Sequence, residues 1–160
     1  MKRRIGLGVG LLVLASTVGC GDIDPRAGIW FIDNDGVIED TCKVSAVQLT
    51  SGEFKVFRAE DGDLIIDPQD GTEPFKCTID GDAFECPNRL SQTISVGSFD
   101  AEVDVHAHVD GAFDSDESAS GVRHAELSCR GDDCDSLAAS FSTSLPCEMS
   151  VSFTADYLRD

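Results

Sequence analysis

Alternation of apolar and polar residues is the sequence feature that most restricts the possible folds. In residues 99–109 the odd positions are apolar and the even positions are acidic or histidine. This is the two-residue period of a strand with one buried face. Shorter alternating or apolar segments recur along the chain, separated by turns such as Asp61-Gly62 and Asp70-Gly71. The pattern predicts an all-β fold, an antiparallel meander of about eight to ten strands that forms a barrel or a sandwich.

The same patterns predict the boundaries of individual elements. The first strand is expected over residues 28–33, because a turn-forming Asp-Asn-Asp-Gly sequence follows, and another strand over 43–50. A polar loop is expected over 114–120. One short helix is expected near 133–140, with Asp133 as its N-cap. The chain has no internal repeat and no sign of a second domain.

The N-terminus has the pattern of an export signal. A basic start at residues 2–4 precedes an uncharged apolar segment, which is shorter than the ~20 apolar residues of a transmembrane span. Cys20 follows this segment directly. We therefore divide the chain into a signal peptide at 1–19, a tether at 20–27 and a single β domain at 28–160.

The sequence Thr17-Val18-Gly19-Cys20 resembles the lipobox of bacterial lipoproteins. The resemblance implies cleavage before Cys20, acylation with chains such as palmitate, and anchoring to a lipid bilayer, since two acyl chains hold a protein stably. It implies a folded domain in the bacterial cell envelope, facing the periplasm or the cell exterior. The alternative is an ordinary secretory signal in which the cysteine occurs by chance.

Six cysteines follow Cys20, and an even number in an oxidising compartment predicts three disulfides. A hairpin over residues 76–86, with a two-residue turn at Gly81-Asp82, puts Cys77 opposite Cys86. This is a non-hydrogen-bonded pair, close enough for a disulfide. The sequence leaves open the pairing of the other four, which are Cys42, Cys129, Cys134 and Cys147. Their spacing lacks the closely spaced thiolates of a zinc site.

Net charge restricts the partners. The chain has 30 Asp and Glu against 12 Lys and Arg, and its formal charge of −18 repels nucleic acid and anionic lipid. We therefore expect no nucleic-acid partner. The sequence contains no nucleophile elbow, phosphate loop or dinucleotide fingerprint, and its cysteines are assigned to disulfides or acylation. The protein is accordingly not expected to be an enzyme.

The three histidines form a candidate metal site. His106 and His108 share a strand face by the two-residue period, and His124 falls on the polar face of the predicted neighbouring strand. All three can converge, with Asp104 and Glu126 nearby, in an arrangement that binds zinc or another divalent metal. The alternative is a polar strand face that is simply solvated.

The sequence Gly28-Ile29-Trp30, at the start of the first strand, resembles the Gly-x-Trp of lipocalin-like barrels. The resemblance implies a barrel that carries a small ligand. We expect an envelope-anchored binding or structural module, whose partner is an unidentified envelope protein or a small ligand. The alternative function is a small-ligand or metal-ion carrier, and the third is a metal-dependent hydrolase.

Overall fold

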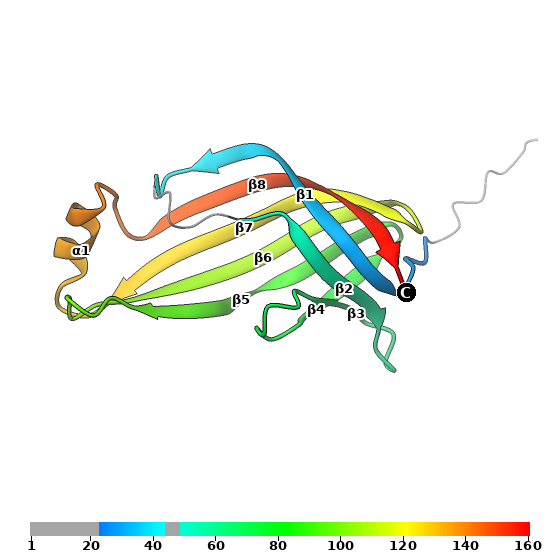
Figure 1. Cartoon of the computed structure of the whole chain (residues 1–160), viewed down its shortest axis with the longest axis horizontal. Coiled ribbons are helices and arrows are strands. Elements are labelled where there is room, and N and C mark those ends of the chain that lie inside the picture. The colour runs from blue at the N-terminus through cyan, green and yellow to red at the C-terminus, as the bar shows by residue number, and fades with distance from the viewer. Residues whose placement is uncertain (1–22, 44–48) are drawn as a thin grey trace, which may run out of the picture.

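The computed structural model describes residues 23–43 and 49–160, and it confirms the all-β fold. Eight strands follow one another in an antiparallel meander, and β1 pairs with β8, so the sheet closes into a barrel and not a sandwich (Figure 1). The elements are β1 (Gly28–Asp40), β2 (Gly52–Arg58), β3 (Leu64–Asp67), β4 (Phe75–Asp80), β5 (Ala83–Ser95), β6 (Glu102–Ser115), β7 (Ser118–Arg130), α1 (Cys134–Ser140) and β8 (Cys147–Arg159).

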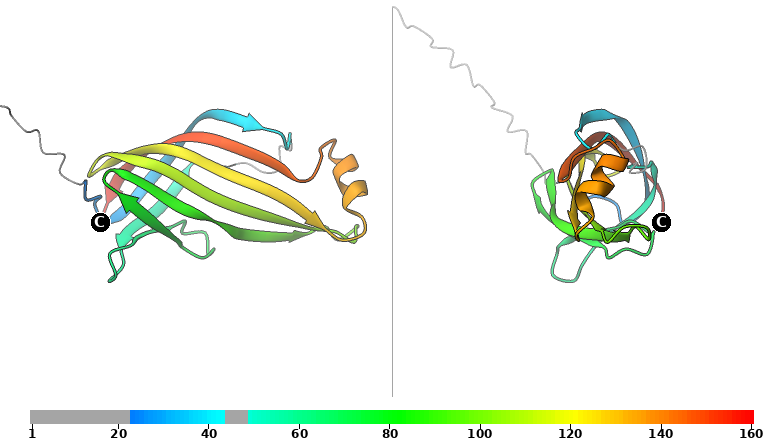
Figure 2. Two further views of the ribbon diagram at one scale, coloured as in Figure 1. Left: turned by 180° about the vertical axis from the view of Figure 1, so that it is seen from behind. Right: turned by 90° about the vertical axis from the view of Figure 1, so that its left-hand side faces the viewer.

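Unequal strand lengths give the barrel two different halves. Strands β2, β3 and β4 have 7, 4 and 6 residues, whereas the other five strands have 13 or 14. All the strands surround the half near the C-terminus, and the long strands continue beyond it as a curved sheet (Figure 1). Helix α1 lies across the far end of this sheet (Figure 2).

The interior contains two apolar clusters, one in each half. In the eight-stranded half, Trp30 is fully buried and packs with aromatic and aliphatic side chains that include Phe84 and Phe153. Beneath α1, the helix residue Leu137 packs in a second cluster that includes Val105. The alternation of β6 is confirmed, because its odd-numbered residues face these clusters and its even-numbered residues face outward.

Three disulfides join neighbouring segments of the barrel. Cys77 and Cys86 pair across the β4–β5 hairpin, whose register sets Ile79 opposite Phe84 as the sequence predicts. The remaining pairs, which the sequence left open, are Cys42–Cys147 and Cys129–Cys134. The first joins the segment after β1 to the start of β8, and the second joins the end of β7 to α1.

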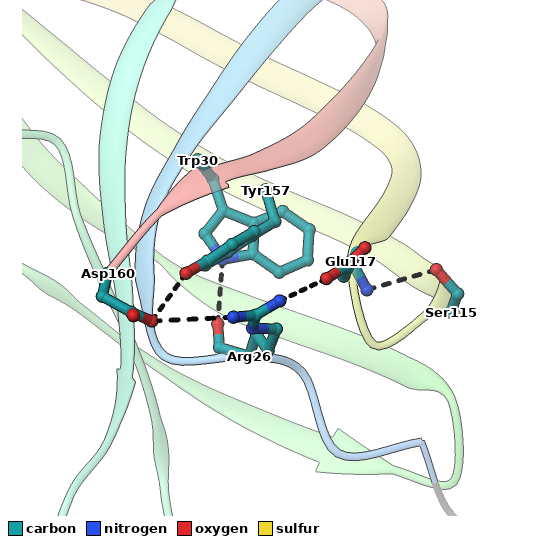
Figure 3. A network of polar contacts seen from close by, with 6 residues as sticks. All are labelled: Arg26, Trp30, Ser115, Glu117, Tyr157 and Asp160. Atoms are coloured by element: carbon teal, nitrogen blue, oxygen red, sulfur yellow. Dashed lines mark hydrogen bonds and ion pairs between the residues drawn. The ribbon is translucent and has the colours of Figure 1, made fainter.

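A network of polar contacts closes the barrel end at the start of β1 (Figure 3). The indole N–H of Trp30 donates a hydrogen bond to the carbonyl oxygen of Arg26 at 2.9 Å. The Arg26 guanidinium pairs with the carboxylate of Glu117 and lies 4.2 Å from the centre of the Tyr157 ring. The Tyr157 hydroxyl donates to Asp160 at 2.6 Å. The segment before β1 is thereby fixed across this end of the barrel.

Gly28 is required where β1 passes close to β8 at this closed end. Its φ of 147° is rarely adopted by other residues, and a Cβ at this position would lie 2.4 Å from the carbonyl oxygen of Arg159. The glycine of the Gly-x-Trp sequence is therefore required here by steric contact with β8.

Two local expectations from the sequence are wrong, and a third is confirmed only in part. Strand β1 continues through residues 33–40, because these residues pair with β8 although their side chains are largely exposed. The polar loop expected over 114–120 is a tight turn at Asp116-Glu117, since β6 and β7 pair almost to their ends. Asp133 occupies the N-cap position of α1 as expected, but its side chain makes no capping hydrogen bond and instead accepts one from the backbone N–H of Asp100.

Several sequence-based predictions fall outside the described residues. They are the signal peptide at 1–19, the acylated Cys20 with the first part of its tether, and most of the strand expected over 43–50. In the part of the chain that the structure describes, no helix is long and apolar enough to cross a membrane.

Candidate functional site

An apolar cavity of about 230 Å³ lies inside the eight-stranded half of the barrel. Six aromatic side chains, one from each of six strands, contribute to its lining: Trp30, Phe54, Phe75, Phe84, Phe113 and Phe153. Exposed residues of the β1–β2 connection, among them Thr50 and Ser51, also line it. The cavity therefore has an apolar wall within the barrel and a polar border near this connection.

Arg123 projects into this interior from β7. It lies opposite Val109 of β6 and Val151 of β8, whose side chains share the inner face. The guanidinium donates hydrogen bonds to the carbonyl oxygen of Thr50 at 3.0 Å and to the side-chain oxygen of Asn34 at 3.4 Å. Burial lowers the pKa of Arg123, yet arginine stays protonated in proteins, so a cation lines the cavity.

Arg89 is a second arginine on the inner face. A bulge after Cys86 changes the register of β5, so Arg89 lies opposite Ala107, an inward-facing residue of β6. Its guanidinium carbon lies 3.8 Å from the centre of the Phe75 ring. The Nε and Nη2 atoms of Arg89 are buried and have no hydrogen-bond partner among the described residues. Desolvated donors of this kind are costly unless a ligand or water satisfies them.

Arg89 and Arg123 differ from the other arginines in their salt-bridge partners. Within residues 23–43 and 49–160, neither Arg89 nor Arg123 has a carboxylate within salt-bridge distance. The remaining four arginines of this part all pair with carboxylates, and they are Arg26, Arg58, Arg130 and Arg159. The two guanidinium groups without a carboxylate partner thus both belong to residues on the inner face of the barrel.

The histidines lie on the outer face of the barrel wall. His108 of β6 stands directly opposite His124 of β7, and the two imidazole rings stack with centroids 4.0 Å apart. Both Nε2 atoms approach the same Oδ1 of Asp110, at 3.4 Å from His108 and 3.1 Å from His124. His106 lies opposite Glu126, one step along the same face.

The structure brings together only part of the predicted histidine site. His108 and His124 meet as expected, but the third group within reach is Asp110, and not His106. Asp104, which was expected nearby, instead pairs with Arg130 and accepts a hydrogen bond from Thr93.

Comparisons with known proteins return nothing. No family model matches the chain, and neither a curated protein nor a solved structure matches it. The lipobox and the Gly-x-Trp resemblance accordingly stay predictions, and a functional assignment depends on the geometry of the two sites.

Sequence reasoning missed three of the residues in these sites. Asp110 carries a usable signal, because it follows His108 by two residues and so shares its strand face. Arg123 also carries one, since it falls on the same face as Ala125 and Leu127. Arg89 carries none, because the bulge that turns it inward is not evident from its neighbours.

Proposed function

We propose that the protein is an envelope-anchored binding module whose barrel interior takes a small amphipathic anion. The observation that carries this proposal is the apolar cavity with an unpaired arginine in its lining. An apolar wall provides affinity for a hydrocarbon or aromatic group, and a few polar groups fix its orientation. Arg123 supplies the group that a carboxylate or similar anion would contact.

Cavity volume limits the size of this ligand. An apolar cavity of ~150 Å³ holds a benzene molecule. By proportion, the cavity of about 230 Å³ in this barrel would hold a ligand of about nine non-hydrogen atoms. Short fatty acids and simple aromatic acids have this size and combine an apolar body with one negative charge.

Charge explains why an anion site would need arginines inside the barrel. The chain carries a formal charge of −18, so an anion that approaches its surface is repelled. A guanidinium in a partly desolvated interior attracts an anion more strongly than an exposed one, because the local dielectric constant is lower. Among the described residues, neither Arg123 nor Arg89 has a carboxylate within salt-bridge distance. Two acidic residues also line the cavity, but Glu53 pairs with Arg159 and Asp70 accepts hydrogen bonds from Thr72.

Heptanoate should bind to the purified full-length protein about ten- to a hundredfold more tightly than its uncharged isostere heptanamide. The reason is the charge-assisted hydrogen bond to Arg123, worth roughly 1.5 to 3 kcal/mol. Trp30 is the only tryptophan and lines the cavity, so its fluorescence provides the measurement. The variant Arg123→Met should bind both compounds with similar affinity.

Arg130→Met is the matched control for this experiment. Arg130 lies on the same strand but faces outward, where it pairs with Glu102 and Asp104. This variant should keep the preference for heptanoate. Equal affinities of the unaltered protein for the two compounds, or loss of the preference in Arg130→Met, would refute the anion proposal.

The proposed anchor is the acylated Cys20, and it is tested independently of the barrel. The basic and apolar N-terminal segment supports it, and the three disulfides of the folded domain are typical of an oxidising compartment outside the cytoplasm. In cells that produce the full chain, Cys20→Ser should move the protein from the membrane fraction to the soluble fraction. Retention in the membrane fraction would contradict anchoring through this cysteine.

A further inference from the structure

We propose that His108, Asp110 and His124 bind one divalent metal ion of the zinc class on the outer face of the barrel. The three side chains each offer one ligand atom, and these atoms all lie within 4.8 Å of one another. This site differs in chemistry from the interior cavity. Its coordinating side chains are two imidazoles and a carboxylate, and it would bind a cation, whereas the cavity would bind an anion.

The distances fit a metal that sits between these atoms. Zinc bonds to imidazole nitrogen and carboxylate oxygen are about 2.0 to 2.2 Å long, so the ligand atoms of a tetrahedral site stand roughly 3.3 Å apart. The Nε2 atoms of His108 and His124 lie 3.4 and 3.1 Å from Oδ1 of Asp110. Two edges of the required tetrahedron are thus already present in the folded chain.

The third edge, between the two Nε2 atoms, requires both imidazole rings to reorient. The two imidazole planes differ by only 6°, so the Nε2 lone pairs lie in two nearly parallel planes and cannot both point at one ion. Binding requires each ring to tilt until both Nε2 lone pairs converge on the ion. Both rings are about one-third exposed, with relative exposures of 35% and 36%, and this leaves room for the tilt.

The backbone that carries the ligands is regular. Strands β6 and β7 pair without a register shift from Glu102 opposite Arg130 to Phe113 opposite Ala119. His108 and His124 form one cross-strand pair of this ladder, and Asp110 lies two residues further along β6. Side chains on paired strands hold a metal site more accurately than side chains on loops.

Charge around the histidines favours a cation. They border a surface hollow of about 340 Å³, to which Glu39, Glu126 and Glu148 also contribute carboxylates. No lysine or arginine of the described chain lines this hollow. The carboxylates raise the local concentration of cations. Three protein ligands leave the fourth position of a tetrahedral zinc ion for water or another ligand.

The ligand types select among metals. Calcium and magnesium prefer six or more oxygen ligands, so a set of two imidazoles and one carboxylate does not suit them. Imidazole nitrogen suits zinc, copper and nickel, and tetrahedral sites of this composition favour zinc. Zinc is therefore the probe of choice, with calcium as the negative control.

Zinc titration of the untagged full-length protein, purified in detergent, tests the proposal by isothermal calorimetry. We expect one equivalent of Zn²⁺ to bind and Ca²⁺ to give no heat of binding at the same concentration. The variants His108→Ala, His124→Ala and Asp110→Asn should each lower zinc affinity by about tenfold or more. These side chains are only half-buried, and unchanged far-ultraviolet circular dichroism will show that each variant folds.

His106→Ala is the decisive control, because His106 lines the same hollow without belonging to the proposed ligand set. It should retain zinc affinity within about twofold. If His106→Ala loses zinc as strongly as His108→Ala, or if the unaltered protein binds no zinc, the proposal is overturned. Heptanoate binding is measured separately, so failure of the metal site leaves the interior-ligand proposal standing, and the reverse is also true.

Discussion

Replacing both Cys42 and Cys147 with alanine should lower the free energy of unfolding by about 4 to 5 kcal/mol. This disulfide joins residues 105 positions apart, and a cross-link that closes a loop of ~100 residues restricts the unfolded chain by roughly 4.7 kcal/mol. A domain of this size has a total stability of about 5 to 15 kcal/mol, so the variant should be close to unfolding. Urea denaturation followed by circular dichroism measures the loss.

The location of this disulfide strengthens the expectation. Residues 33–40 of β1 extend past the end of β2, and within residues 23–43 and 49–160 they pair only with β8. The Cys42–Cys147 bond fixes the far end of this two-stranded extension, and both sulfurs are buried in the cluster beneath α1. Without the bond, the far end of this two-stranded extension should fray.

The matched control is the paired replacement of Cys129 and Cys134 with alanine. This bond joins residues only 5 positions apart, and the same chain-entropy relation predicts a loss of about 2 kcal/mol. The two variants should therefore differ by more than 2 kcal/mol. Equal losses would show that loop closure is not what makes the long-range disulfide stabilising.

Prediction from sequence succeeded where one face of a strand is buried. In β6, Val103 and Val105 face the core while the residues between them face solvent, so the two-residue period is visible. Prediction failed for residues 33–40, where backbone pairing with β8 continues although the side chains are largely exposed. Such a segment has no hydrophobic pattern, and its Asp, Asn and Gly residues resemble a turn.

The candidate sites were likewise predictable where the strands are regular and unpredictable where they are not. Register between two regular strands is predictable, and so the meeting of His108 and His124 could be anticipated. The inward direction of Arg89 depends on a bulge, which changes the alternation of β5 until a second register shift between Leu90 and Gln92. The cavity itself results from how six aromatic rings fill a closed barrel, and no local sequence pattern specifies that packing.

Trp30→Ala should lower the free energy of unfolding by about 3 to 5 kcal/mol, the range for removal of a buried aromatic side chain. Trp30 is fully buried, and its ring lies 6.0 to 6.5 Å, centre to centre, from the rings of Phe54, Phe113 and Tyr157. The substitution would enlarge the existing cavity and remove the hydrogen bond to the Arg26 carbonyl. Circular dichroism must follow this unfolding, because the only tryptophan is lost.

Two further variants separate the contributions of Trp30. Trp30→Phe keeps an aromatic ring but removes the donor to Arg26, so it should cost about 1 kcal/mol plus the smaller loss of packing. Phe31→Ala is the control, because Phe31 is the next residue, 38% exposed, and its loss should cost less than about 1 kcal/mol. If Phe31→Ala were as destabilising as Trp30→Ala, the outer face of β1 would be as important as the interior. If only Trp30→Ala is severe, the closed end of the barrel depends on the indole ring that fills it.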